Sequence, residues 1–213
     1  MTAKDEADTE AGQLYSAERA KAFIDAVVAI AMTLLILPLM ESVGEAASSD
    51  QSTVEWWNEN TGALFAFVLS FAVIGNFWVS HHRQFAGVTA VTNGLIWLTM
   101  AWMLTIVWLP IATAVVGQLE TDTLQKVLYI GSMLITSLLM LFIQLYLTRH
   151  PQVHRIPDDR LRVGLRVDLI LVALFAVALI VAVAVPAVSY YAMFLLLLTS
   201  PIQRLTSRRT RDR

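Results

Sequence analysis

The sequence predicts an all-α polytopic membrane protein with six transmembrane helices and both termini in the cytoplasm. Three observations support this fold class. Hydrophobic residues make up 57% of the 213 residues and charged residues only 15%, whereas soluble domains carry roughly 25% charged residues. The apolar residues are gathered in runs of about 20, the length that crosses a bilayer as a helix. Finally, Lys and Arg are concentrated in alternate loops between these runs.

The apolar runs define the expected spans, in order, as residues 22–40, 62–80, 91–116, 125–147, 167–185 and 188–203. Backbone groups in hydrocarbon must be hydrogen-bonded within the segment, which favours helices. The polar–apolar alternation of a membrane barrel is absent. We expect Pro110 to end or kink the third span. Around the spans we expect a disordered cytoplasmic tail at 1–15, a six-span channel domain at 16–205 and a basic cytoplasmic tail at 206–213.

The basic residues indicate the orientation. The segments before span one, between spans two and three, between spans four and five, and after span six hold fourteen of the fifteen Lys and Arg residues, and Lys126 is the other. Cytoplasmic loops are enriched in basic residues, so both ends are expected inside. An odd number of spans would destroy this alternation. The expected outer loop at 41–60 carries five carboxylates and no basic residue.

Several kinds of chemistry are not indicated by the sequence. There is no cysteine, which excludes disulfides, thiolate metal sites and cysteine nucleophiles. We find no phosphate-binding glycine loop, zinc motif or catalytic triad pattern. We therefore expect no enzyme activity, cofactor or metal site. The Arg-rich C-terminal tail lies next to a span, so topology and anionic lipid headgroups explain it better than nucleic acid does.

Asp25 lies about one turn inside the first span, where a charge is costly and normally has a partner. At a similar depth, the adjoining ends of spans two and three carry polar and aromatic residues. We expect this group to hold Asp25 in a structural polar clamp formed with Arg19, Phe23, His81, His82, Arg83, Asn93 and Trp97. The alternative is a proton relay through Asp25.

The first span also carries an apolar stripe. At about 100° per residue, one side of the helix bears Arg19, Phe23, Ala26, Ile30, Thr33, Leu34 and Leu37. Asp25 points well away from that side. The stripe either lines a pore or packs against lipid or another subunit.

The motif Arg19-xxx-Phe23-Ile24-Asp25, followed by Ala29-Ile30-xx-Thr33-Leu34, resembles the first-helix signature of the transmembrane protein 175 family. The segment Trp78-xx-His81-His82-xx-Phe85 at the end of the second span is also similar to this family. The family has Ser where this chain has Ile24, so no role of that hydroxyl is carried over. The six-span unit covers residues 16–205.

The resemblance implies a potassium-permeable channel in a prokaryotic plasma membrane. Single-unit members assemble as homotetramers, and the first helix of each subunit lines a central pore. The family lacks the Thr-Val-Gly-Tyr-Gly carbonyl filter, which is also absent here. Carried over to this sequence, a hydrophobic constriction falls on Ile30, with the Thr33 hydroxyls beside it and Leu34 and Leu37 further out. The expected partners are potassium and other monovalent cations, the lipid bilayer and further copies of the chain.

Two other functions stay open at this stage. A proton-coupled secondary transporter or proton channel would use Asp25 and the nearby histidines. A membrane scaffold would transport nothing. A channel differs from both because it carries an ohmic current that reverses near the equilibrium potential of its ion.

Overall fold

The structure is a computed structural model that describes residues 15–120 and 122–184. Within these ranges it has five helices that are long and apolar enough to cross a membrane. The described ranges are therefore helical apart from their connectors and two strands of two residues each. This agrees with the expected all-α class. The expected sixth span at 188–203 and the basic tail at 206–213 lie outside the described residues, as does nearly all of the expected tail at 1–15.

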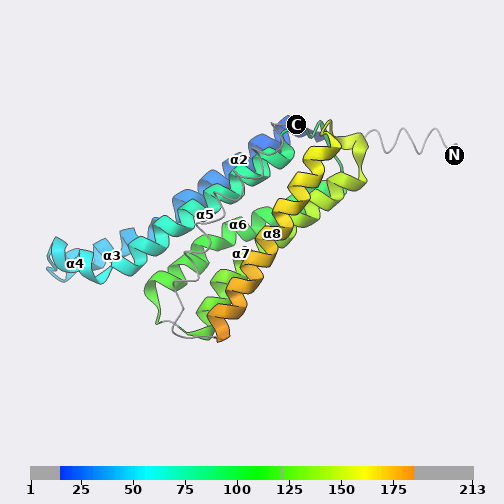
Figure 1. The fold of residues 1–213 in the computed structure, drawn as a ribbon. Coiled ribbons are helices and arrows are strands. Elements are labelled where there is room, and N and C mark those ends of the chain that lie inside the picture. The colour runs from blue at the N-terminus through cyan, green and yellow to red at the C-terminus, as the bar shows by residue number, and fades with distance from the viewer. Residues whose placement is uncertain (1–14, 121, 185–213) are drawn as a thin grey trace, which may run out of the picture.

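The long helices form an elongated bundle (Figure 1). They are α2 (Ala17–Leu34), continued by α3 (Leu37–Ser48), then α5 (Thr61–Phe85), α6 (Asn93–Gln118), α7 (Thr123–Arg149) and α8 (Asp158–Ala184). A helix of 26 residues such as α6 is about 39 Å long at 1.5 Å per residue. It therefore exceeds the hydrocarbon thickness of about 30 Å. Pro110 lies inside α6 without ending it.

The first span is interrupted between α2 and α3. Leu35 and Ile36 form a turn there, and Pro38 occupies the first turn of α3. Proline has no backbone N–H, so it cannot continue the α2 hydrogen-bond ladder but is well tolerated at a helix start. The Ile36 N–H instead bonds to the Thr33 carbonyl at 3.3 Å. The chain changes direction at this point, and Figure 1 shows α3 and α4 (Thr53–Glu59) at the far end of the bundle.

Two expected boundaries were wrong. The segment 41–60 was expected to be a loop, but α3 extends to Ser48 and α4 fills much of the remainder. The fifth span was expected to begin at 167, but α8 begins at Asp158. Arginines on the exposed side of α8 interrupt the apolar run, although Leu161 and Asp168 on its other side are buried. The Pro157 carbonyl accepts the first helical hydrogen bonds, and Asp158 and Asp159 suit the positive end of the helix dipole.

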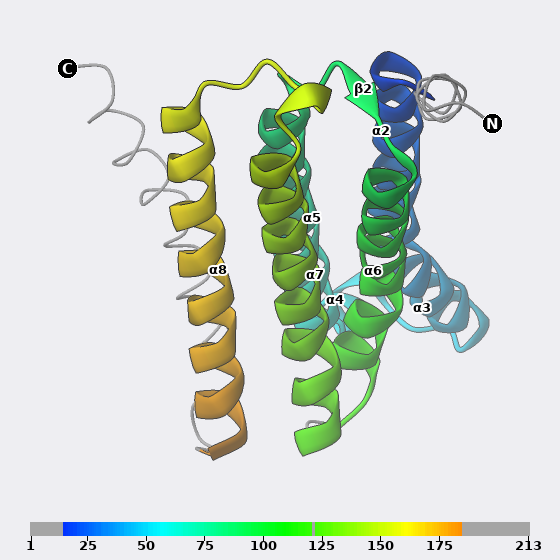
Figure 2. The same ribbon diagram turned by 90° about the vertical axis from the view of Figure 1, so that its right-hand side faces the viewer.

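The connectors at one end of the bundle are tied together. β1 (Tyr15–Ser16) pairs with β2 (Ala90–Val91) in antiparallel fashion, and Val88 forms a bridge with His154. A short 3-10 helix, η1 (Pro151–Val153), precedes that bridge. Figure 2 shows the start of α2, the α5–α6 connector with β2 and the α7–α8 connector at this same end.

Buried polar side chains link the helices of the bundle. The Tyr129 and Ser70 hydroxyls lie 2.7 Å apart, and Thr113 donates to the Ser70 hydroxyl at 2.8 Å. These bonds join α5, α6 and α7 in the apolar interior, where interhelical hydrogen bonds hold membrane bundles together.

A second polar cluster joins α5, α7 and α8. Gln84 donates to the Gln144 side-chain oxygen at 2.7 Å, and Gln144 donates to the Leu161 carbonyl at 3.0 Å. Asp168 is buried beside this cluster, 3.4 Å from the Gln84 amide nitrogen.

Candidate ion-conduction site

The two sides of α2 differ sharply in burial. Residues spaced three or four apart pack into the protomer core, namely Ile24, Val28, Ala31 and Leu35. The opposite side is exposed along its whole length, and it is the stripe of Arg19, Phe23, Ala26, Ile30, Thr33, Leu34 and, in α3, Leu37. Ile30 has 59% of its surface exposed. It is therefore not packed inside its own protomer.

Thr33 has a local geometry that matters for an ion path. Its hydroxyl donates to the Ile30 carbonyl at 2.7 Å. Because the hydrogen is used in that bond, the oxygen lone pairs remain free to accept from water or to contact a cation. The side chain is exposed on the same side of α2 as Ile30. One turn of helix thus combines a bulky aliphatic group and an oxygen acceptor.

Asp25 has a different partner from the one expected. The Trp78 indole Nε1 donates to Asp25 Oδ1 at 2.8 Å, which links α2 to α5. Trp78 in turn lies against His82, with ring centroids 5.7 Å apart. A tryptophan N–H in a helix bundle usually finds an acceptor. Trp78 could therefore have been predicted from the sequence as a donor to Asp25.

Of the two histidines of the expected clamp, His82 lies against Trp78 and His81 lies elsewhere. His81 is buried and stacked between Phe85 and Trp102, at centroid distances of 4.3 and 4.2 Å. In the described ranges Asp25 has no hydrogen bond or ion pair with Arg19, His81, His82, Arg83 or Trp97. The expectation that the histidines hold Asp25 directly was therefore wrong. Positions 78 and 82 share one side of α5, whereas 81 is turned about 100° away from 82.

The residues at the far end of the bundle are acidic and exposed. Glu41 and Glu45 lie on α3, Glu55 and Glu59 lie on α4, and Asp50 lies between these helices. Glu55 belongs to a capping box in which Ser52 and Glu55 bond to each other. The expected acidic outer loop is thus a pair of helices that displays carboxylates to solvent.

Comparison with known proteins shows which family part of this chain resembles. The family model for the endosomal/lysosomal potassium channel TMEM175 matches residues 19–110, which include the exposed stripe of α2 and the Asp25–Trp78 pair. Over these residues the chain is similar to the TMEM175 family. The match confirms the resemblance carried by Arg19, Phe23 and Asp25. Together with the five long apolar helices of the described ranges, the match supports an integral membrane protein.

Individual relatives of this chain are named as channels. A potassium channel of Streptomyces collinus is 33% identical over 102 residues, which is 47% of this chain and 47% of that protein. An endosomal/lysosomal proton channel TMEM175 of Danio rerio is 24% identical over 140 residues, covering 64% of this chain and 26% of that protein. The alignments span about half the length of the bacterial relatives.

A solved structure shows the same fold over a longer stretch. The crystal structure of a lysosomal potassium-selective channel TMEM175 homolog from Chamaesiphon minutus matches with a TM-score of 0.71. The match covers 88% of this chain and 97% of that one, at 22% sequence identity. The fold of this chain is therefore similar to that of the Chamaesiphon minutus homolog.

Proposed function

We propose that the chain forms a potassium-permeable cation channel in which copies of α2 surround a central ion path. The observation that carries this proposal is the stripe on α2, which is exposed on the outside of the protomer although α2 is otherwise packed into the bundle. The names of the bacterial relatives support a channel rather than an enzyme. The orientation with both ends inside and the homotetramer are part of the proposal.

Symmetry explains why the stripe can form a pore. A bundle of five or six helices fills its own centre with side chains, so a wide path within one protomer is not expected. In a closed cyclic assembly the same surface of each subunit faces the axis. Four Ile30 side chains would then meet as a hydrophobic ring, which gates conduction by losing its water. Leu34 and Leu37 would extend the apolar wall outward.

Thr33 supplies the polar part of this path. Its hydroxyl oxygen lies one turn from Ile30 and keeps its lone pairs free, because the hydrogen is bonded to the Ile30 carbonyl. Four such oxygens can stabilise a cation that has lost part of its hydration shell beside the apolar ring.

The acidic end of the bundle favours cations over anions. The five exposed carboxylates on and between α3 and α4 raise the local concentration of cations at the mouth that we assign to the outside. At the opposite end lie the start of α2, the last turns of α5 and α7, the connector before α8 and the beginning of α8. These segments carry most of the described basic residues, namely Arg19, Lys21, Arg83, Arg149, Arg155, Arg160, Arg162 and Arg166. This distribution supports the proposed orientation.

The test is a bi-ionic reversal potential measured on purified protein in planar bilayers. We expect an ohmic current that reverses near the potassium equilibrium potential.

Replacing Ile30 with Asn should raise the leak conductance, because a polar ring stays hydrated. Ile180→Asn is the matched control, since Ile180 on α8 is 66% exposed but lies outside the stripe. Unchanged currents in Ile30→Asn, or an equal rise in both variants, would contradict the pore assignment.

Proton transport is the second candidate, and the name of the Danio rerio relative favours it. In this chain it would involve Asp25, with Trp78 as donor and His82 beside that indole. A proton-coupled transporter predicts saturable flux driven by a pH gradient. The same bilayer recording separates the two, because a reversal potential that follows the proton gradient would favour this candidate.

A further inference from the structure

His154 links three segments at the end of the bundle where α2 begins. Its Nε2 atom lies 3.0 Å from the carbonyl oxygen of Leu147 in α7. Its Nδ1 atom lies 3.1 Å from the backbone nitrogen of Ile156, in the connector between α7 and α8. His154 also forms a β-bridge with Val88, in the connector between α5 and α6. Both ring nitrogens therefore have a backbone partner.

These two partners determine which nitrogen of the His154 ring carries hydrogen. A carbonyl oxygen can only accept, so Nε2 is the donor. A backbone N–H can only donate, so Nδ1 is the acceptor. A flipped ring would place carbon atoms at both positions, so the same contacts also fix the orientation of the ring. The observed bonds therefore require a neutral imidazole in the Nε2–H tautomer.

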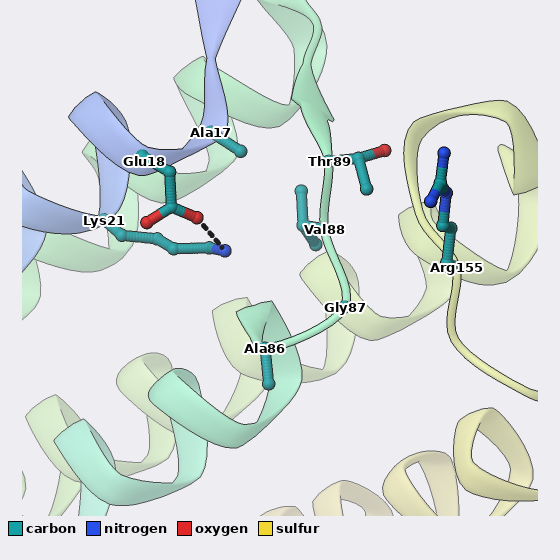
Figure 3. Close-up of a pocket in the computed structure, with 8 residues that line it drawn as sticks. All are labelled: Ala17, Glu18, Lys21, Ala86, Gly87, Val88, Thr89 and Arg155. Carbon is teal, nitrogen blue, oxygen red and sulfur yellow. Dashed lines mark hydrogen bonds and ion pairs between the residues drawn. The ribbon is translucent and has the colours of Figure 1, made fainter.

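The bond at Nδ1 holds Ile156 in a closely packed place. The Arg155 N–H donates to the Gly87 carbonyl at 2.8 Å. The Thr89 N–H donates to the Val153 carbonyl at 2.9 Å. These bonds keep the two connectors side by side, and Figure 3 shows Gly87 and Thr89 on one of them and Arg155 on the other. A Cβ atom on Gly87 would lie 2.5 Å from Ile156 Cγ1, so Ile156 reaches this place only beside a glycine.

The same set of backbone bonds extends to α2. β2 lies in the α5–α6 connector and pairs with β1, which directly precedes α2. Backbone bonds thus run from the start of α2 through the α5–α6 connector to the α7–α8 connector. The His154 ring adds the end of α7 to this set.

We propose that His154 is an acid-sensitive latch, which holds the α7–α8 connector in place while its ring is neutral and releases Ile156 when the ring gains a proton. Histidine is the side chain that ordinarily changes charge between pH 5 and 8, and His154 is only half-buried. Both nitrogens of a protonated ring are donors. An Nδ1–H would then face the Ile156 N–H, so that bond is lost.

The bond at Nε2 survives protonation of His154. Its acceptor, the Leu147 carbonyl, belongs to the last turn of α7, and the C-terminal end of a helix favours a cation. The protonated ring therefore stays on α7 while the connector that follows is released. The latch thus acts on the connectors that adjoin the start of α2.

The other charged groups around the ring do not replace its partners. The titratable side chains on the neighbouring segments are Glu18 and Lys21 on α2, Arg83 on α5, Tyr146, Arg149 and His150 at the end of α7, Arg155 in the connector, and Asp158 and Asp159 on α8. The α5–α6 connector at 86–92 has none. Within residues 15–120 and 122–184, none of these side chains forms a hydrogen bond or ion pair with the His154 ring. The folded arrangement therefore gives a new Nδ1–H no acceptor.

The test is hydrogen–deuterium exchange of the purified full chain in detergent, resolved to single amides by NMR and divided by the intrinsic exchange rate at each pH. Between about pH 8 and about pH 5, we expect the protection of the Ile156 and Arg155 amides to fall about fivefold, the effect of losing one hydrogen bond. This inference does not depend on the channel proposal, because exchange is measured without any current.

Two variants separate the latch from a general effect of acid. His154→Gln cannot gain a proton, so protection of both amides should no longer change with pH, whether or not the glutamine replaces the lost acceptor. His150→Gln is the matched control. The His150 Nδ1 donates to the Tyr146 carbonyl at 2.9 Å, and a protonated ring keeps that bond. His150→Gln should therefore respond to pH as the unaltered chain does.

The nitrogen chemical shifts of the His154 ring add an independent check, because they distinguish its two neutral tautomers. The Nδ1–H tautomer at about pH 8 would overturn the proposal. Protection that is constant with pH in the unaltered chain, or an equal fall in His154→Gln, would overturn it as well. A fall confined to Ile156, with Arg155 unchanged, would show that the latch does not act on the contact between the two connectors.

Discussion

At the scale of single residues, the contact between Asp25 and Trp78 shows how α2 is held to α5. A carboxylate inside a span is costly unless it accepts hydrogen bonds, and the Trp78 indole supplies one at 2.8 Å. The sequence indicated that Asp25 needs a partner, but it did not identify which of several nearby donors would be used. A single step along a helix turns a side chain by about 100°, so neighbours such as His81 and His82 face different surroundings.

This contact predicts a measurable loss of stability. Trp78→Phe keeps the aromatic ring but removes the donor, so it should lower the free energy of unfolding by about 1 kcal/mol. The measurement is thermal unfolding in detergent, combined with Asp25→Asn in a double-mutant cycle. Trp97→Phe is the matched control, because Trp97 is 73% exposed. An equal loss in both variants, or additive effects with Asp25→Asn, would show that the bond contributes nothing.

At the scale of elements, sequence patterns predicted the cores of the spans better than their ends. The runs at 62–80, 91–116 and 125–147 lie within or close to α5, α6 and α7, because an apolar run of that length has few other stable forms. The early start of α8 at Asp158 and the helical character of 41–48 were missed. Both segments are amphipathic or polar, so average hydropathy does not identify them as helices. The spacing of Leu161 and Asp168, which share one side of a helix, is a pattern that could have indicated the early start of α8.

The short helix α4 makes a prediction about pH. Ser52 donates to the Glu55 carboxylate from its N–H at 2.9 Å and from its hydroxyl at 2.6 Å. These bonds favour the ionised form and lower the pKa of Glu55 below its usual value of 4.5. At a pH above the usual pKa, ionised Glu55 therefore stabilises the start of α4 in full. This stabilisation is lost as the pH falls through the lowered pKa that Glu55 has in the folded protein.

Removing the Ser52 hydroxyl tests this assignment. In Ser52→Ala the pKa of Glu55 should rise toward its usual value, as followed by NMR titration of the carboxyl carbon. Ser48→Ala serves as the control, because the Ser48 hydroxyl donates to the Glu45 carbonyl and not to Glu55. If the two variants give the same titration curve, the capping box does not set the ionisation of Glu55.

At the scale of the whole molecule, the protomer has one long exposed stripe on the helix that begins the bundle. Helical geometry predicted which residues of α2 share this side, and the structure places Arg19, Phe23, Ile30 and Thr33 on the exposed side as expected. What the stripe faces in the assembly depends on contacts between subunits. Neither the sequence pattern nor a single protomer contains those contacts. The pore is therefore a proposal about how copies of α2 are arranged around a symmetry axis.

The central claim is that Ile30 side chains of different subunits meet around an ion path. The chain has no cysteine, so an introduced thiol is unique in each subunit. Several thiolates that converge on one axis form a site for a soft cation such as Cd²⁺. The decisive measurement is therefore the Cd²⁺ sensitivity of potassium current through Ile30→Cys, with Ile180→Cys as control. The account predicts that Cd²⁺ blocks the potassium current of Ile30→Cys and leaves that of Ile180→Cys unchanged. If the two variants were equally sensitive to Cd²⁺, the result would contradict the account.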